Sequence, residues 1–126
     1  WIECMEDKRQ ELVNWTEQFV NAFNKMDLNE VTNSFAENSV YEDSKGNRFY
    51  GKSEIKKAFE PLLSGEMGTI HFEGEDIFVE VTSGKVMTSW ILTIELKGVK
   101  TKIKGLDLLK FNNGKVLEKL AYRKQD

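Results

Sequence analysis

The chain has few of the residues that build disulfides and metal sites. Its 126 residues include one cysteine, Cys4, and one histidine, His71. A single cysteine cannot form a disulfide within the chain, which suits a reducing compartment, so we expect a cytoplasmic protein. Because the sequence begins at Trp1, a signal segment removed upstream stays an alternative. Zinc sites and two-histidine iron sites need several His or Cys ligands, so we expect no metal and no other cofactor.

The sequence also lacks an excess of positive charge and any long apolar run. Its net charge is −3 at pH 7, which argues against a broad nucleic-acid surface. No run approaches the length of a membrane-spanning helix, so we expect no membrane partner. With 40% hydrophobic residues, the chain is long enough for one domain with a real core. We predict a single domain over residues 1–126, with its core over about 7–124.

The apolar pattern predicts helices first and strands afterwards. Apolar residues recur at spacings of three and four on one face of a helix over about 7–26. Asp27 and Glu30 form a capping pair for a second helix, and Ser53 is expected to cap a third, which Pro61 should end or kink. From Thr69 the period becomes two, and turns divide the remainder into four antiparallel strands. This order predicts an α+β domain, with three helices packed against a curved, mainly antiparallel sheet.

One carboxylate falls on the dry face of a predicted strand. In the stretch KTKIKGLDLLKF, residues 100–111, the lysines occupy even positions, whereas Asp107 shares odd positions with Ile103, Leu109 and Phe111. Strand side chains alternate between faces, so Asp107 should face the core. In a dry pocket it could keep its proton and donate a hydrogen bond. The alternative is an ionised structural aspartate that is hydrogen-bonded or paired with Arg123.

The segments NKMDL, FAENSVYED and YGKSEIKKAF, followed by four long strands, carry a family resemblance. Over about residues 10–123 the chain resembles the ketosteroid isomerase and SnoaL-like polyketide cyclase branch of the NTF2-like superfamily. The resemblance implies a cone-shaped fold with a hydrophobic pocket between the helices and the sheet. It also implies an isomerase or cyclase that works by aspartate acid/base chemistry without a cofactor.

The family's catalytic residues are only partly present. The resemblance places the general base at Asp43 and the protonated, enolate-binding acid at Asp107. The family's enolate-binding tyrosine falls at Phe19, which has no hydroxyl. Tyr41 is the best substitute for that hydroxyl, because it shares a strand face with Asp43. The alternative for Asp43 is a carboxylate that caps the following turn, SKGN. Related epoxide hydrolases carry an arginine where this chain has Gly105, which counts against hydrolysis.

The predicted pocket has apolar walls and an undecided charge. Phe19, Phe59 and Trp90 are expected to form the walls. If the family's register holds, Lys119, Ala121 and Arg123 point into the pocket and Arg123 could meet an anionic ligand, whereas a slip of one residue would send both cations to water. His71 groups by parity with exposed glutamates, so we expect it in solvent.

Two functions follow from these observations. The first is proton transfer, an isomerisation or cyclisation, on a small hydrophobic carbonyl compound, with Asp43 as base and Asp107 as enolate donor. The second is a non-catalytic, dimeric module for ligand binding or protein interaction. In either case we predict a homodimer through the outer sheet face, because the outer side of one strand is uncharged over four alternate positions: Met87, Ser89, Ile91 and Thr93.

Overall fold

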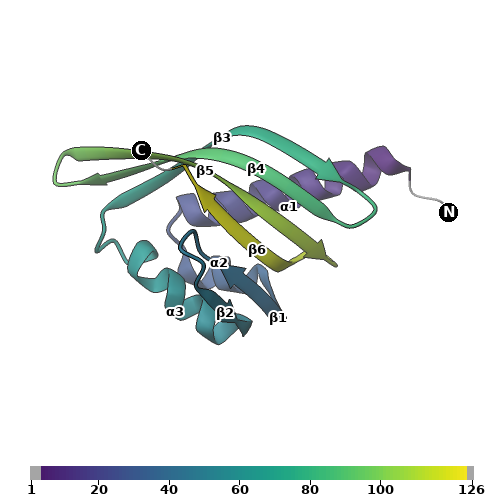
Figure 1. Ribbon diagram of the computed structural model, residues 1–126, viewed down its shortest axis with the longest axis horizontal. Coiled ribbons are helices and arrows are strands. Elements are labelled where there is room, and N and C mark those ends of the chain that lie inside the picture. The colour runs from purple at the N-terminus through teal and green to yellow at the C-terminus, as the bar shows by residue number, and fades with distance from the viewer. Residues whose placement is uncertain (1–3, 125–126) are drawn as a thin grey trace.

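The computed structural model describes residues 4–124 (Figure 1). Residues 1–3 and 125–126, which the expected domain of 1–126 includes, lie outside the described part. The helices are α1 (Met5–Asn24), α2 (Leu28–Asn33) and α3 (Gly51–Leu63). The strands are β1 (Phe35–Glu42), β2 (Arg48–Tyr50), β3 (Thr69–Glu80), β4 (Lys85–Leu96), β5 (Val99–Asn112) and β6 (Lys115–Arg123).

The six strands form one curved, unclosed sheet in the order β2-β1-β6-β5-β4-β3. Strands β1 and β6 are parallel, and the other neighbours are antiparallel. Helix α1 packs against β3 and β4, and α3 packs against β1 and β2 (Figure 1). The expected α+β fold, with helices against a mainly antiparallel sheet, is confirmed. We call the helix-covered side of the sheet the inner face and the opposite side the outer face.

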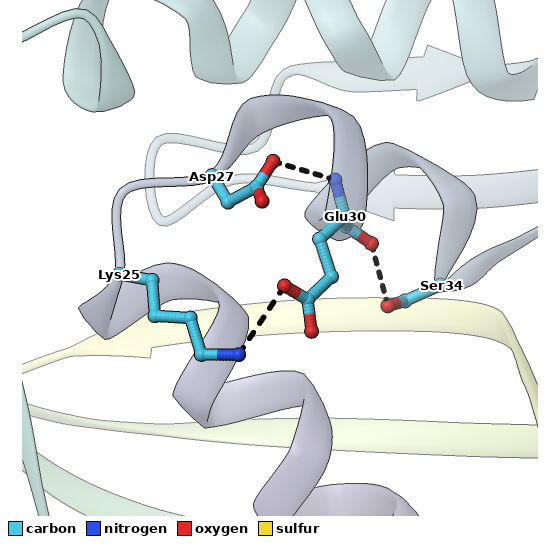
Figure 2. A network of polar contacts seen from close by, with 4 residues as sticks. All are labelled: Lys25, Asp27, Glu30 and Ser34. Carbon is cyan, nitrogen blue, oxygen red and sulfur yellow. Dashed lines mark hydrogen bonds and ion pairs between the residues drawn. The ribbon is translucent and has the colours of Figure 1, made fainter.

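The junction between α1 and α2 forms largely as the sequence predicts (Figure 2). The backbone N–H of Glu30 donates to the Asp27 carboxylate over 3.0 Å, so Asp27 caps α2. The Glu30 carboxylate lies 3.5 Å from the Lys25 ammonium, and the Ser34 hydroxyl donates to the Glu30 carbonyl oxygen. Helix α1 ends at Asn24, two residues before the predicted end, and Met26 takes the left-handed conformation.

The third helix begins earlier than predicted and does not end at Pro61. It begins at Gly51, and Ser53 is not its cap; instead, the Tyr50 N–H donates to the Glu54 carboxylate over 3.0 Å. A glycine at φ +80° lets the chain turn directly from β2 into the helix, which leaves Ser53 inside the first turn. Pro61 lies inside the helix, which continues to the buried Leu63. Burial of Leu63 holds the last residues in place beyond the proline.

The long strands alternate as predicted. On β5, Asp107, Leu109 and Phe111 are buried on the inner face, while Leu108 and Lys104 are exposed. The pairing of β3 with β4 shifts between Gly74 and Asp76, which confirms a bulge where the alternation fails. None of the helices in the described range is long and apolar enough to cross a membrane. The core consists of buried side chains from all three helices and the inner face, including Phe23, Val31, Phe35, Ile55, Ile70, Val86, Leu109 and Val116.

Candidate functional site

A cavity of about 310 Å³ opens on the inner face of the sheet. Its walls come from α1, α3, strands β1 and β3–β6, and the turn after β1. The apolar part of the lining is Phe23, Phe59, Leu62, Met67, Phe72, Trp90, Leu92, Ile94, Ile103 and Ala121. The polar part is Tyr41, Asp43, Ser44, Lys45, Asn47, Lys119 and Arg123. The volume is near the lower end of the range for small-molecule pockets, about 300–1,000 Å³.

A buried ion pair stands at the wall of this cavity. The Lys119 ammonium donates to the Asp107 carboxylate over 2.8 Å, and the side chains are 7% and 10% exposed. The same ammonium lies 5.3 Å from the ring centroid of Tyr41, 5.9 Å from that of Phe23 and 6.0 Å from that of Phe59. Aromatic faces at these distances attract a cation, so the ammonium occupies an aromatic enclosure with one carboxylate partner.

The partner of Asp107 is Lys119 and not Arg123, the cation that we considered from the sequence. Asp107 lies opposite Ala121 in the β5–β6 pairing, so Lys119 and Arg123 are its two diagonal neighbours on the same face. Arg123 is at the exposed end of β6, whereas Lys119 is buried. Lys119, Ala121 and Arg123 all line the cavity, as the family's register implies. Asp107 is not among the lining residues, whereas its partner Lys119 is.

Asp43 lines the cavity from the turn that follows β1. Its Oδ1 accepts hydrogen bonds from the backbone N–H groups of Lys45 and Asn47, both over 2.9 Å, and its Oδ2 accepts from the Asn47 amide. Partial burial alone would raise the pKa of Asp43, but the hydrogen bonds from Asn47 and Lys45 hold its pKa below the ordinary value. Asp43 therefore caps the turn, the alternative considered from the sequence, and it also faces the cavity.

Tyr41 brings a neutral hydroxyl to the same cavity. Its ring stacks on Phe59 with a centroid separation of 4.4 Å and on Phe49 with 5.6 Å. Burial raises the pKa of Tyr41 far above its ordinary value, and the Asp107 and Asp43 carboxylates raise it further. The phenol therefore keeps its proton and remains a possible hydrogen-bond donor at neutral pH.

Comparisons with known proteins show the family to which the chain belongs. The model of the SnoaL-like domain matches residues 16–119, which is most of the chain. The chain belongs to the SnoaL-like domain family. No curated protein matched the chain.

Solved structures share the fold of this SnoaL-like domain at low sequence identity. Bal32a, from a soil-derived mobile gene cassette, is 19% identical, with a TM-score of 0.78 over 94% of this chain and 92% of its own. The epoxide hydrolase/cyclase-like enzyme SalBIII, which has a role in pyran ring formation in the polyether salinomycin, is 14% identical, with a TM-score of 0.81 over 93% of each chain. A protein with a ketosteroid isomerase-like fold from Catenulispora acidiphila, in complex with trimethylamine, is 15% identical, with a TM-score of 0.73 over 86% of this chain and 83% of its own.

Phe19 and Gly105 are the two positions at which the resemblance implies a different side chain. Phe19 is 3% exposed and packs edge-on against Phe23 and Phe35, and it is not among the lining residues. This placement of Phe19 does not support the prediction that it contacts a ligand. At Gly105, a Cβ atom would collide with the Tyr122 carbonyl oxygen and the Trp90 ring. An arginine could not replace this glycine without moving Trp90.

The remaining predicted residues are placed as follows. Tyr41, Phe59, Trp90 and Arg123 line the cavity, and His71 is exposed on β3. Within residues 4–124 there is no group of three or more His, Cys, Asp and Glu side chains suited to holding a metal ion. From the sequence, Lys119 was expected only as a cation that could point inward, and its pairing with Asp107 was missed. Strand spacing does not choose between the two cations, because Lys119 and Arg123 flank the position opposite Asp107 equally.

Proposed function

We propose that this SnoaL-like domain binds a small, mainly apolar molecule in the cavity, through a carbonyl or carboxylate oxygen that accepts a hydrogen bond from Lys119. The observation that carries the proposal is the buried Lys119 ammonium at the wall of an otherwise largely aromatic and aliphatic cavity. An ammonium has three N–H donors, and the Asp107 carboxylate accepts only one of them here. An acceptor oxygen on a ligand would satisfy another donor, and the aromatic walls would bury the ligand's body.

Proton transfer on such a carbonyl ligand is the second candidate, an isomerisation or a cyclisation. Asp43 faces the same cavity as Lys119, so it would serve as the base, while Lys119 and Tyr41 would stabilise the developing enolate. The Asp107 carboxylate, bonded to Lys119, would position that ammonium rather than act as a neutral donor. The hydrogen bonds that lower the pKa of Asp43 make it a weak base, which favours binding without chemistry over fast turnover.

We also propose that the outer sheet face joins two copies of the chain. Four apolar side chains form a row across neighbouring strands, because the pairings align Phe78, Met87, Leu108 and Leu120. Phe78 is 62% exposed and Leu108 is 40% exposed, so this row lacks cover in a single chain. A second aligned row beside it carries both signs of charge, Glu80, Lys85, Lys110 and Glu118, which suits contact with a second copy better than with a strongly charged partner.

Binding is tested with ligands that share one apolar body. We would titrate isotope-labelled protein with acetophenone, benzoate and ethylbenzene and follow the backbone amide signals by NMR. The expected result is that the ketone or the acid shifts signals around Tyr41, Trp90 and Lys119, and that ethylbenzene binds more weakly. In Lys119→Met, loss of a hydrogen bond to a charged group, about 1.5–3 kcal/mol, should weaken the oxygen-bearing ligands by about tenfold or more. The hydrocarbon should bind as before.

Two outcomes would contradict the proposal. If none of the three compounds shifts signals at the cavity, it is not a site for ligands of this class. If Lys119→Met leaves the affinities for all three unchanged while the folded spectrum persists, the ammonium is not the polar anchor. Exchange of the α-protons of acetophenone for deuterium, measured with wild-type protein and Asp43→Asn, distinguishes proton transfer from binding alone. Catalysis predicts exchange that depends on Asp43.

A further inference from the structure

The Lys119 side chain becomes a nucleophile once its ammonium gives up a proton, a property that the proposed hydrogen bond leaves unused. Its side chain is 7% exposed, yet it lines the cavity, so a small molecule that enters the cavity meets it directly. Three aromatic rings surround the Nζ atom, at 5.3 to 6.0 Å from their centroids. Lysines that form Schiff bases with carbonyl substrates are of this kind, amines placed in hydrophobic pockets.

We propose that Lys119 forms a Schiff base with an aldehyde or unhindered ketone bound in the cavity, and that Asp107 carries the proton which this reaction requires. The inference rests on the proposed binding of a carbonyl compound and goes beyond it, since it adds a covalent bond. The observation that supports it is the position of Asp107, which lies 2.8 Å from the Lys119 ammonium and is not among the residues that line the cavity. The carboxylate can exchange a proton with the amine without occupying the space of the ligand.

The steps balance within this pair. Asp107 accepts one proton from the ammonium, which turns a buried ion pair into a neutral amine and a neutral acid; burial in a medium of low dielectric makes the ion pair costly to maintain. The amine nitrogen then forms a bond to the carbonyl carbon, and the carbonyl π electrons move to oxygen, which takes the second amine proton. Asp107 then returns its proton to the nitrogen, the nitrogen passes one of its protons to the hydroxyl, and the hydroxyl leaves as water. The product is a protonated imine beside the Asp107 carboxylate.

The surroundings of Lys119 support this chemistry over a plain structural ion pair. A structural pair would be equally stable with both members hidden from any cavity, whereas here only the amine faces one. The mainly apolar walls limit the water that would hydrolyse an imine. The other charged side chains at the cavity, Asp43, Lys45 and Arg123, lie in the turn after β1 or at the exposed end of β6. Of the two lysines that line the described cavity, Lys45 is exposed and Lys119 is buried.

The test is reductive trapping with a defined probe. Wild-type protein is incubated with benzaldehyde and sodium cyanoborohydride at neutral pH, and the modified lysine is located by peptide mass mapping at early times. Exposed lysines such as Lys100 and Lys102 are internal references, because they lie in solvent and do not line this cavity. Proximity in the cavity should make Lys119 acquire its benzyl group about tenfold or more ahead of them.

Lys119→Arg is the matched control. Arginine keeps a cation beside Asp107 but does not form a reducible imine, so the early modification should disappear while the exposed lysines react as before. An excess of acetophenone should slow trapping in the wild-type protein by competing for the cavity. Circular dichroism tests whether the variant is folded. If the variant is unfolded, the peptide mass map of the trapped wild-type protein alone identifies the modified lysine.

The outcomes separate this inference from the proposed function. If benzaldehyde shifts the NMR signals of the cavity but is trapped only on exposed lysines, ligand binding stands and the Schiff base is refuted. If the NMR titration shows no binding in the cavity and Lys119 is not trapped, both the proposed function and the Schiff base fall. If Lys119 leads the reaction and its modification is lost in Lys119→Arg, the inference is supported.

Discussion

The Lys119 ammonium and the Asp107 carboxylate lie 2.8 Å apart, and each side chain is at most 10% exposed. Loss of one partner leaves a buried charge without its counterion, which typically costs about 3–5 kcal/mol, whereas replacing both partners by apolar residues is often nearly neutral. The contribution of Lys119 and Asp107 to stability is therefore best measured by replacing them singly and together. The ligand experiments on Lys119 variants depend on knowing this contribution.

The first prediction is a double-mutant cycle on this pair. Lys119→Met and Asp107→Val should each lower the free energy of unfolding by about 3 kcal/mol, and the double variant by about 1 kcal/mol or less, because it leaves no unpaired charge. Urea unfolding followed by circular dichroism gives all four values. Additive losses in the double variant would show that the two side chains do not stabilise each other.

The second prediction concerns Asp43 and pH. Its pKa is lowered in the folded protein from the ordinary value of 3.8, so its contribution to stability is present above that value and is lost as the pH falls through the folded pKa. Asp43→Asn keeps an oxygen acceptor but removes the charge, so it should cost about 1 kcal/mol at neutral pH. The difference from wild type should vanish in acid.

Urea unfolding of both proteins between about pH 7 and pH 3 measures this difference. Subtracting the free energy of unfolding of Asp43→Asn from that of the wild type at each pH cancels the effect of the other carboxylates, which titrate in both proteins. A constant difference across the range would mean that the charge of Asp43 does not stabilise the turn. Ser44→Ala, in the same turn, is the matched control, because no hydrogen bond from Ser44 to Asp43 is described and its effect should not depend on pH.

The third prediction compares two glycines in strands. Alanine at Gly105 would place its Cβ against the Tyr122 carbonyl oxygen and the Trp90 ring, whereas alanine at Gly74 meets no atom within 4 Å. Overpacking of a dense region costs about 1–3 kcal/mol, so Gly105→Ala should lower the melting temperature and Gly74→Ala should not. Thermal unfolding of both variants decides it. Equal stability of the two would mean that β5 and β6 adjust to admit the methyl group.

The fold was predictable from the sequence because its signals are local or periodic. The helical spacing in α1, the Asp27 cap and the two-residue period from Thr69 each reflect hydrogen bonds or packing within one element. The cap of α3 was predicted wrongly, because Gly51 in the left-handed conformation turns the chain into the helix before Ser53 is reached.

The site was predictable only in part, because it depends on contacts between strands. Alternation along β5 placed Asp107 on the inner face, but the direction of Lys119 and Arg123 on β6 stayed open. In the structure both cations lie on the same face as Asp107 and line the cavity. Which cation pairs with Asp107 depends on how deeply each one is buried. Arg123 is the exposed last residue of β6, whereas the Lys119 ammonium lies against aromatic rings from α1 and α3. The alternation of side chains along a strand indicates the face on which a residue lies but not how deeply it is buried.

The fourth prediction tests the proposed dimer through the apolar row on the outer face. Leu108 occupies the middle of that row, between Met87 on β4 and Leu120 on β6. A charge there would lose its water if two copies met at this face, so Leu108→Glu should turn a dimer into a monomer at micromolar concentration, as measured by size exclusion with light scattering. Lys100→Glu introduces the same residue at an exposed position of β5 outside the row, and it should leave the dimer intact. A monomeric wild-type protein, or a Leu108→Glu variant that remains dimeric, would remove the outer face as the interface.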